Sequence, residues 1–89
     1  MIELEKYYSE ENWKHFSETF QGLNVPNNLI MSLNDNEELA KVIFGLLEKD
    51  SNDWINKSVP ALDYLKPLDC LEKENLLKRL KVCLTRMPI

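Results

Sequence analysis

The chain has 89 residues, of which 44% are hydrophobic and 29% charged, the balance of a soluble globular domain rather than of a disordered or membrane protein. No apolar run approaches the roughly 18–20 residues of a membrane span, and the acidic stretch MIELEKYYSEEN differs from a signal peptide. We therefore expect one small cytoplasmic domain with a modest single core.

The net charge of −4 is unevenly distributed. Residues 1–53 hold eleven acidic residues and four lysines, a net charge of −7, whereas residues 54–89 hold four acidic and seven basic residues, a net charge of +3. This asymmetry fits either solvated helix faces or a surface for a partner of opposite charge. Nucleic acid is not expected as a partner, because the whole chain is acidic and no helix-turn-helix or aromatic-basic platform is recognisable. A membrane is not expected either.

The first predicted helix begins after Ser9, a good N-cap, and ends near Gly22. Acidic residues in its first turn suit the helix dipole. Its apolar face is aromatic and consists of Trp13, Phe16, Phe20 and Leu23. Such a face is either part of the core or, where exposed, an interface for a partner or a second copy.

The next long predicted helix follows NVPNNLIMSL, a stretch that predicts one or two helical turns starting at Pro26. Asn34 is the predicted N-cap, with Glu37 completing a capping box. The apolar stripe of this helix is Leu39, Val42, Ile43, Leu46 and Leu47. Gly45 costs about 1 kcal/mol relative to alanine in a helix, which indicates a close approach by another helix at that position.

Two prolines then interrupt the helical pattern. A short helix carrying Trp54 and Ile55 is predicted, with Ser51 or Asn52 as its cap. Pro60 disfavours a helical residue before it, and Pro67 does the same while suiting the first turn of a new helix. The segment between the prolines should be anchored to the core by Ala61, Leu62, Tyr64 and Leu65.

The chain ends in a basic, amphipathic helix that starts at Pro67, is broken near Glu74 and stops at Pro88. Its apolar row is Leu68, Leu71, Leu76, Leu77, Leu80, Cys83, Leu84 and Met87. Its basic residues are Lys73, Lys78, Arg79, Lys81 and Arg86. Because no strand pattern or repeat stands out, we predict an all-α bundle of about four to six helices with a proline-punctuated crossover.

The sequence predicts no catalytic, cofactor-binding or metal-binding residues. His15 is the single histidine and has no partner at ligand spacing, and two glycines cannot form a phosphate loop. Cys70 and Cys83 lie among leucines and are interpreted as buried thiols. The acidic residues on the helices are interpreted as solvated, so we expect a protein that is not an enzyme.

Residues 39–87 resemble the toxin-binding domain of Xre/MbcA/ParS-type bacterial antitoxins. The matching positions are Leu39, Ala40, Phe44-Gly45, Trp54-Ile55, Pro60-Ala61-Leu62, Pro67-Leu68-Asp69, Leu71, Leu80, Leu84 and Arg86-Met87. Tyr64 and Asn75 stand where members of the family usually carry glycine, and residues 1–38 do not resemble the helix-turn-helix domain of full-length antitoxins.

The resemblance implies a non-catalytic bacterial antitoxin domain that dimerises and occludes the active site of a toxin, commonly a RES-domain enzyme that degrades NAD. It implies partner contacts at the C-terminal end, which here consists of Lys78, Arg79, Arg86, Met87, Pro88 and Ile89. On this view residues 39–89 form the toxin-binding unit and residues 1–38 form a helical extension packed on it, within one compact domain.

A second hypothesis is a structural or adaptor protein that keeps the scaffold without a toxin and forms a homo-oligomer. Its self-complementary apolar face would consist of Trp13, Phe16, Phe20, Leu76 and Leu80. The two hypotheses differ in whether the protein silences a partner enzyme. Because a scaffold motif builds a core, each of four residues in the resembling stretch is also explained as an ordinary core residue: Trp54, Leu62, Leu68 and Leu71. Function must then come from the surface.

Overall fold

The computed structural model describes residues 4–87. Within this range the chain forms α-helices and short 3₁₀-helices, with an isolated antiparallel bridge between Val59 and Leu65. The α-helices are α1 (Glu10–Glu18), α2 (Asn27–Ser32), α3 (Glu37–Leu47), α4 (Ser51–Ile55) and α5 (Glu74–Thr85). The 3₁₀-helices are η1 (Leu4–Tyr7), η2 (Glu48–Asp50), η3 (Pro60–Leu62) and η4 (Pro67–Cys70). The predicted all-α fold is confirmed.

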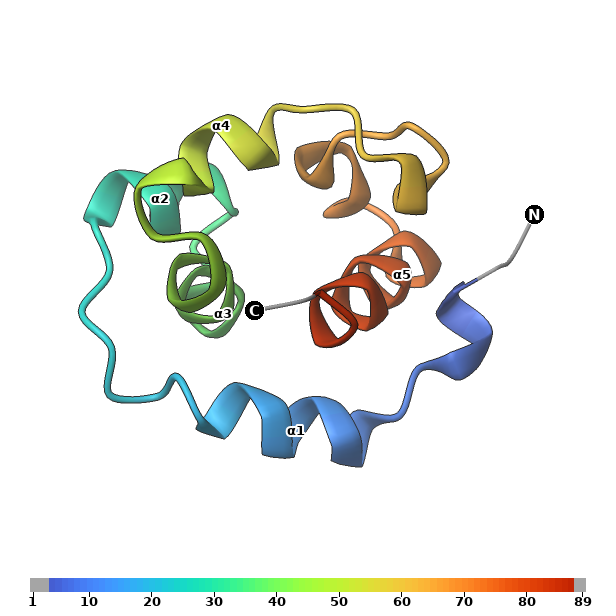
Figure 1. The fold of residues 1–89 in the computed structure, drawn as a ribbon, viewed down its shortest axis with the longest axis horizontal. Coiled ribbons are helices and arrows are strands. Elements are labelled where there is room, and N and C mark those ends of the chain that lie inside the picture. The colour runs from blue at the N-terminus through green and yellow to red at the C-terminus, as the bar shows by residue number, and fades with distance from the viewer. Residues whose placement is uncertain (1–3, 88–89) are drawn as a thin grey trace.

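Helices α3 and α5 are seen nearly end-on in Figure 1, and α1 passes beneath both of them. α1 contacts α3 and α5, η1 lies against α5, and α2 and α4 pack on α3. One hydrophobic cluster unites these elements and includes Leu4, Trp13, Leu39, Leu62 and Leu80. The expected boundary between residues 38 and 39 lies inside α3, because that helix begins at Glu37.

The caps of the two longer N-terminal helices follow the sequence with one correction. Ser9 is the N-cap of α1, and its hydroxyl accepts a hydrogen bond from the Asn12 backbone N–H (3.3 Å). Asn34 does not cap α3, because it lies at φ 59° in the turn that closes α2. Asn36 caps α3 instead, and its side-chain oxygen accepts from the Leu39 N–H (3.0 Å). The cap is thus two residues later than predicted.

The prediction of a side-chain cap for α4 is also wrong. Ser51 is the first residue of the helix, and Asp50, which precedes it, makes no side-chain capping bond. The Ser51 hydroxyl instead donates to the Glu48 carbonyl oxygen (2.7 Å). The direct continuation of η2 into α4 removes the need for a separate cap, because the backbone before Ser51 is already helical.

Both prolines act as predicted. Val59 and Lys66 are extended, with ψ of 119° and 144°, and Pro60 and Pro67 each begin a 3₁₀ turn. The last helical segment is broken before Glu74, where α5 starts. These turns fix the path of the crossover between α4 and α5.

The predicted anchors of the crossover are half correct. Leu62 is fully buried and Leu65 is partly buried, but Ala61 and Tyr64 are exposed. Asp63 and Tyr64 both adopt left-handed backbone conformations, with φ of 59° and 64°. This reversal directs the chain back toward Val59, whose carbonyl accepts from the Tyr64 N–H (3.0 Å), and leaves the Tyr64 ring in solvent. Tyr64 therefore occupies a backbone conformation that favours glycine.

The left-handed position of Tyr64 yields a stability prediction. We expect Tyr64→Gly to be more stable than Tyr64→Ala by about 1 kcal/mol, because only glycine adopts this backbone conformation without steric cost. The alanine variant is the matched control, since both changes remove a ring that is 67% exposed. Urea unfolding followed by circular dichroism gives the two free energies. Equal stabilities would show that the turn relaxes without cost.

At Gly45, α3 lies very close to a neighbouring side chain. A Cβ atom added there would overlap ring atoms of Phe20, which follows α1 in the chain. The predicted close approach at Gly45 is confirmed, although the neighbour is the ring of Phe20 in the turn after α1 rather than another helix. Phe20 also packs edge-on against Phe16, with ring centroids 5.4 Å apart. Gly45 thus accommodates the aromatic face of α1.

This contact makes the effect of Gly45→Ala depend on residue 20. In the natural background the substitution should destabilise the protein by about 1–3 kcal/mol, because the overlap forces the Phe20 ring out of its place. In a Phe20→Ala background the same substitution should be neutral or stabilise by up to about 1 kcal/mol, because alanine favours helix over glycine. A double-mutant cycle by chemical denaturation measures the difference. Additive effects would contradict the steric explanation.

Candidate partner-binding site

The structure separates the predicted partner-binding residues into two groups. Arg86 is exposed, Lys78 and Met87 are partly buried, and all three lie on or just after α5. Arg79 lies on the same helix, but its side chain is 11% exposed and fully engaged within the protein. Pro88 and Ile89 lie outside the described residues. The surface available to a partner therefore centres on Lys78, Arg86 and Met87.

Arg79 joins three segments that are far apart in the sequence. Its Nε and Nη2 atoms donate to the two carboxylate oxygens of Glu5 in η1, both at 2.8 Å. Its Nη1 atom donates to Oδ2 of Asp63 in the crossover at 2.9 Å. The planar guanidinium suits such a fork of bonds better than lysine would. The assignment of Arg79 to the partner surface is thus corrected, because its donors are used inside the fold.

This arrangement shifts the acid–base behaviour of its members. The hydrogen bonds that Arg79 donates to Glu5 lower the pKa of Glu5 from 4.5 to about 2. The same bonds, together with the negative charges of Glu5 and Asp63, raise the pKa of Arg79. Both groups are therefore charged near neutral pH. The pair holds η1 against α5 as an ionic contact.

The proposed oligomer face is largely internal. Trp13 is 4% exposed and Leu80 is fully buried, so neither side chain is available at the surface. Trp13 also reaches across to α3, where its indole N–H donates to Oε1 of Glu38 (2.6 Å). Phe16, Phe20 and Leu76 pack against the core and are only partly buried. The aromatic stripe is thus mainly core, the first of the two interpretations given for it, and the oligomer face is corrected because Trp13 and Leu80 are buried.

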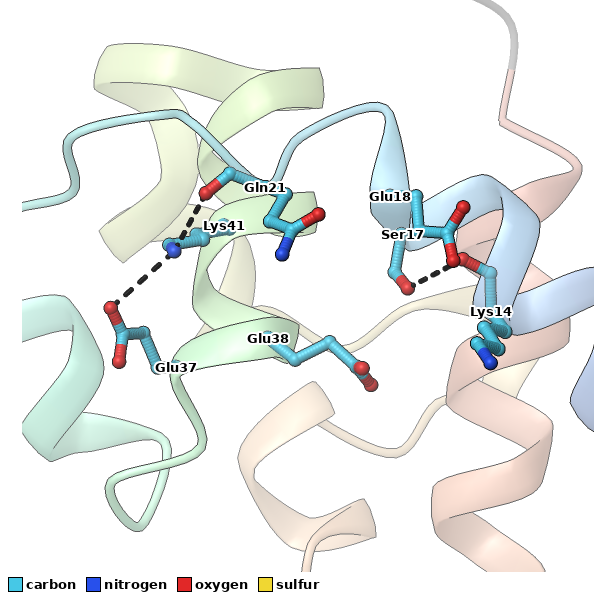
Figure 2. A pocket seen from close by; sticks show the side chains of 7 residues that line it. All are labelled: Lys14, Ser17, Glu18, Gln21, Glu37, Glu38 and Lys41. Carbon is cyan, nitrogen blue, oxygen red and sulfur yellow. Dashed lines mark hydrogen bonds and ion pairs between the residues drawn. The ribbon is translucent and has the colours of Figure 1, made fainter.

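A hollow of about 330 Å³ lies between α1 and α3 and is shown in Figure 2. Lys41 crosses its edge, donating to the Gln21 carbonyl oxygen (2.8 Å) and pairing with Glu37 (3.5 Å). Both positive and negative side chains border this hollow, which is lined by Lys14, Ser17, Glu18, Gln21, Glu37, Glu38 and Lys41. No single charge dominates it, so the charges do not select one class of ligand.

A second hollow, of about 170 Å³, lies where η1 and the start of α1 meet the end of α5. We call it the cation–aromatic hollow. It is lined by Tyr7, Tyr8, Ser9, Asn12, Trp13, Lys81, Val82, Thr85 and Arg86. Two of these residues, Lys81 and Arg86, carry positive charge, and none carries negative charge.

Cations of α5 lie over aromatic rings of the N-terminal segment around this hollow. The guanidinium of Arg86 is 4.9 Å from the Tyr7 ring centroid, and Lys81 Nζ is 5.2 Å from the Trp13 ring and 5.7 Å from the Tyr8 ring. Lys78 Nζ is also 5.7 Å from the Tyr8 ring, and it pairs with Glu74 at 3.7 Å. These distances are within the range of cation–π attraction. The rings hold the cations in place without neutralising them.

Sequence reasoning gave Tyr7, Tyr8 and Lys81 no role in partner binding. The adjacent tyrosines lie in an acidic stretch, and nothing in their spacing shows that they face a helix more than sixty residues later. Burial, followed by the charges of Glu10 and Glu38, raises the pKa of Tyr8. Two acidic residues thus lie close enough to act on the hollow from α1 and α3.

The two cysteines are buried, as interpreted from the sequence, and no disulfide joins them. Burial raises the pKa of the Cys70 thiol to about 11 and also raises that of Cys83. Among residues 4–87, no cluster of three or more histidine, cysteine, aspartate or glutamate side chains is arranged to hold a metal ion. In the same part of the chain, no helix combines the length and apolar character needed to span a membrane.

Comparison of the chain with protein-family models, curated proteins and solved structures finds no match.

The Arg79–Glu5 contact predicts a specific loss of stability in acid. Because folding lowers the pKa of Glu5, the contact contributes its full stability above about pH 4.5 and loses it as the pH falls toward about 2. The stability advantage of the natural chain over Glu5→Gln should therefore shrink across this range. Urea midpoints measured at several pH values test it, with the exposed Glu72→Gln as control. An advantage that does not change with pH would contradict the ionic contact.

Proposed function

We propose that the protein is a non-catalytic protein-binding module, an antitoxin-like inhibitor that binds a partner toxin and covers its active site. The observation that carries the proposal is the cationic end of α5, where Lys78, Lys81 and Arg86 gather on one surface of an acidic chain. Such a patch is a candidate surface for a partner of opposite charge. The partner class, a RES-domain enzyme that degrades NAD, comes from the sequence resemblance.

The location of the resembling residues is consistent with this proposal. Trp54 and Ile55 lie in α4, the Pro60 and Pro67 segments form η3 and η4, and Leu80 and Leu84 are buried in α5. These positions build the scaffold rather than a surface. The scaffold in turn leaves the end of α5, with Arg86 exposed and Met87 partly buried, at the boundary with solvent.

The proposed interface is centred on Arg86. Arg86 is held by the Tyr7 ring, so a partner carboxylate can bind it with less loss of side-chain entropy than a free arginine would require. Arg79 is not part of this interface, because all of its bonds serve the fold. Charge reversal at Arg86 should therefore weaken binding of the partner without unfolding the protein. Charge reversal at Arg79 should unfold the protein.

The test is to capture the tagged protein with its partner and to measure NAD consumption by the partner, bound and released. We expect a stoichiometric partner that is silent in the complex and consumes NAD once freed. Recovery of an oligomer of this protein alone would favour the structural alternative and overturn the proposal. A captured partner whose activity is the same bound and free would also overturn inhibition.

Variants then locate the interface. Arg86→Glu should weaken the complex at least about tenfold, a free-energy change of about 1.4 kcal/mol, because it replaces attraction by repulsion. Removal of residues 87–89 should also weaken it. Lys57→Glu is the matched control, since Lys57 is exposed and lines neither hollow. Titration calorimetry measures the affinities. Unchanged binding by both the Arg86 variant and the truncated chain would place the interface elsewhere.

A further inference from the structure

The cation–aromatic hollow has an unused binding capacity. Among residues 4–87, Lys78 pairs with Glu74, but no carboxylate lies within 4.0 Å of the charged groups of Lys81 or Arg86. Both cations are nevertheless positioned, because each lies over a ring of the N-terminal segment. A guanidinium stacked on a ring keeps its N–H groups at the edge free to donate. Two fixed cations therefore border one small hollow.

The remaining lining adds neutral hydrogen-bonding groups and ring surface. Ser9, Asn12 and Thr85 contribute hydroxyl or amide groups, and the tyrosines contribute ring faces. The amino end of α1 and the carboxyl end of α5 meet here, so their opposite helix dipoles largely offset each other. The charged side chains then decide which ligand is preferred, and they select an anion.

The surrounding charges limit how much negative charge this anion can carry. Glu10 and Glu38 both lie close enough to Tyr8 to affect it electrostatically, and Glu11 follows in the first turn of α1. A single carboxylate that binds between Lys81 and Arg86 is closer to these two cations than to the acidic residues, so attraction exceeds repulsion. A chain of phosphates would extend past these acidic residues and would also be repelled by the net charge of −4.

We propose that the cation–aromatic hollow binds one aspartate or glutamate side chain of a protein partner, with Arg86 and Lys81 as the cations and Tyr7 and Tyr8 as the rings that hold them. The methylene groups of a glutamate suit the ring faces, and its carboxylate suits the edge of the guanidinium. This inference rests on the proposed protein-binding function for its partner, but its chemistry can be tested on the isolated protein.

The test is a chemical-shift titration of the isotope-labelled full chain with the peptide acetyl-Ala-Glu-Ala-amide. We expect saturable shifts at Tyr7, Tyr8, Lys81 and Arg86, with a dissociation constant in the millimolar range. The matched probe acetyl-Ala-Gln-Ala-amide has the same shape without the charge, and it should give no saturable shift. Shifts that are absent, or that centre on another surface, would overturn the proposal.

Variants identify the groups responsible. Arg86→Gln and Lys81→Gln should each lower the affinity for the glutamate peptide at least about threefold, whereas Lys57→Gln should leave this affinity unchanged. Tyr7→Leu should weaken it as well, because the Arg86 guanidinium loses the ring that positions it. The same spectra are used to check that each variant is folded. Equal affinity in the two charge variants and the control would overturn the assignment of Arg86 and Lys81.

Two further probes separate the carboxylate from other anions. Inorganic phosphate and a short oligothymidine are titrated at the same ionic strength, and we expect weaker binding of both at this hollow. Tighter binding of either would overturn the preference for a carboxylate. If the glutamate peptide binds and no partner enzyme is inhibited, the proposed carboxylate site is supported and the proposed inhibitory function is rejected. If a partner is silenced and the peptide does not bind, the function stands and this inference fails.

Discussion

The three hydrogen bonds donated by Arg79 hold together the segments that form the candidate partner-binding surface. They link η1 through Glu5 and the crossover through Asp63 to the middle of α5. Tyr7 and Tyr8 follow Glu5 by two and three positions, so the contact that fixes Glu5 also places the tyrosines beside the cations of α5. A charged group with this little exposure is costly unless every donor is matched. Here Glu5 and Asp63 supply the matching carboxylates, and the bonds to Glu5 hold η1, which borders the cation–aromatic hollow, against α5.

The crossover contributes to the same contact through its backbone. Pro60 and Pro67 each begin a 3₁₀ turn, and an isolated bridge between Val59 and Leu65 closes the segment that joins the two turns. Asp63 lies in this segment in a left-handed conformation, which aspartate tolerates better than most residues, and its carboxylate reaches Arg79. The next residue, Tyr64, adopts the same left-handed conformation, but its exposed side chain does not contribute to the contact with Arg79. The bend therefore serves the position of Asp63.

The elements that sequence reasoning identified are those with strong local signals. Ser9 before α1, the proline turns and the apolar stripe of α3 each depend on a few neighbouring residues, and the structure contains all of them. The cap predicted at Asn34 was misplaced because Asn34 and Asp35 form the left-handed turn that closes α2, so that α3 starts only after Asn36. The interpretation of Arg79 as surface failed for a different reason. Its partner Glu5 is 74 residues away, and no local pattern encodes that pairing.

The candidate site follows the same division. Lys78 and Arg86 were predicted from the sequence resemblance together with the basic last helix, but the rings that hold them come from the opposite end of the chain. The net charge of the chain and the local cations therefore act over different distances. At physiological salt the Debye length is about 8 Å, so the acidic character of the whole chain is largely screened, whereas cations at contact distance act almost fully. A partner with one well-placed carboxylate can therefore bind a protein whose overall charge has the same sign as its own. Lower salt should strengthen the long-range repulsion and the local attraction together, which favours compact acidic groups over extended polyanions.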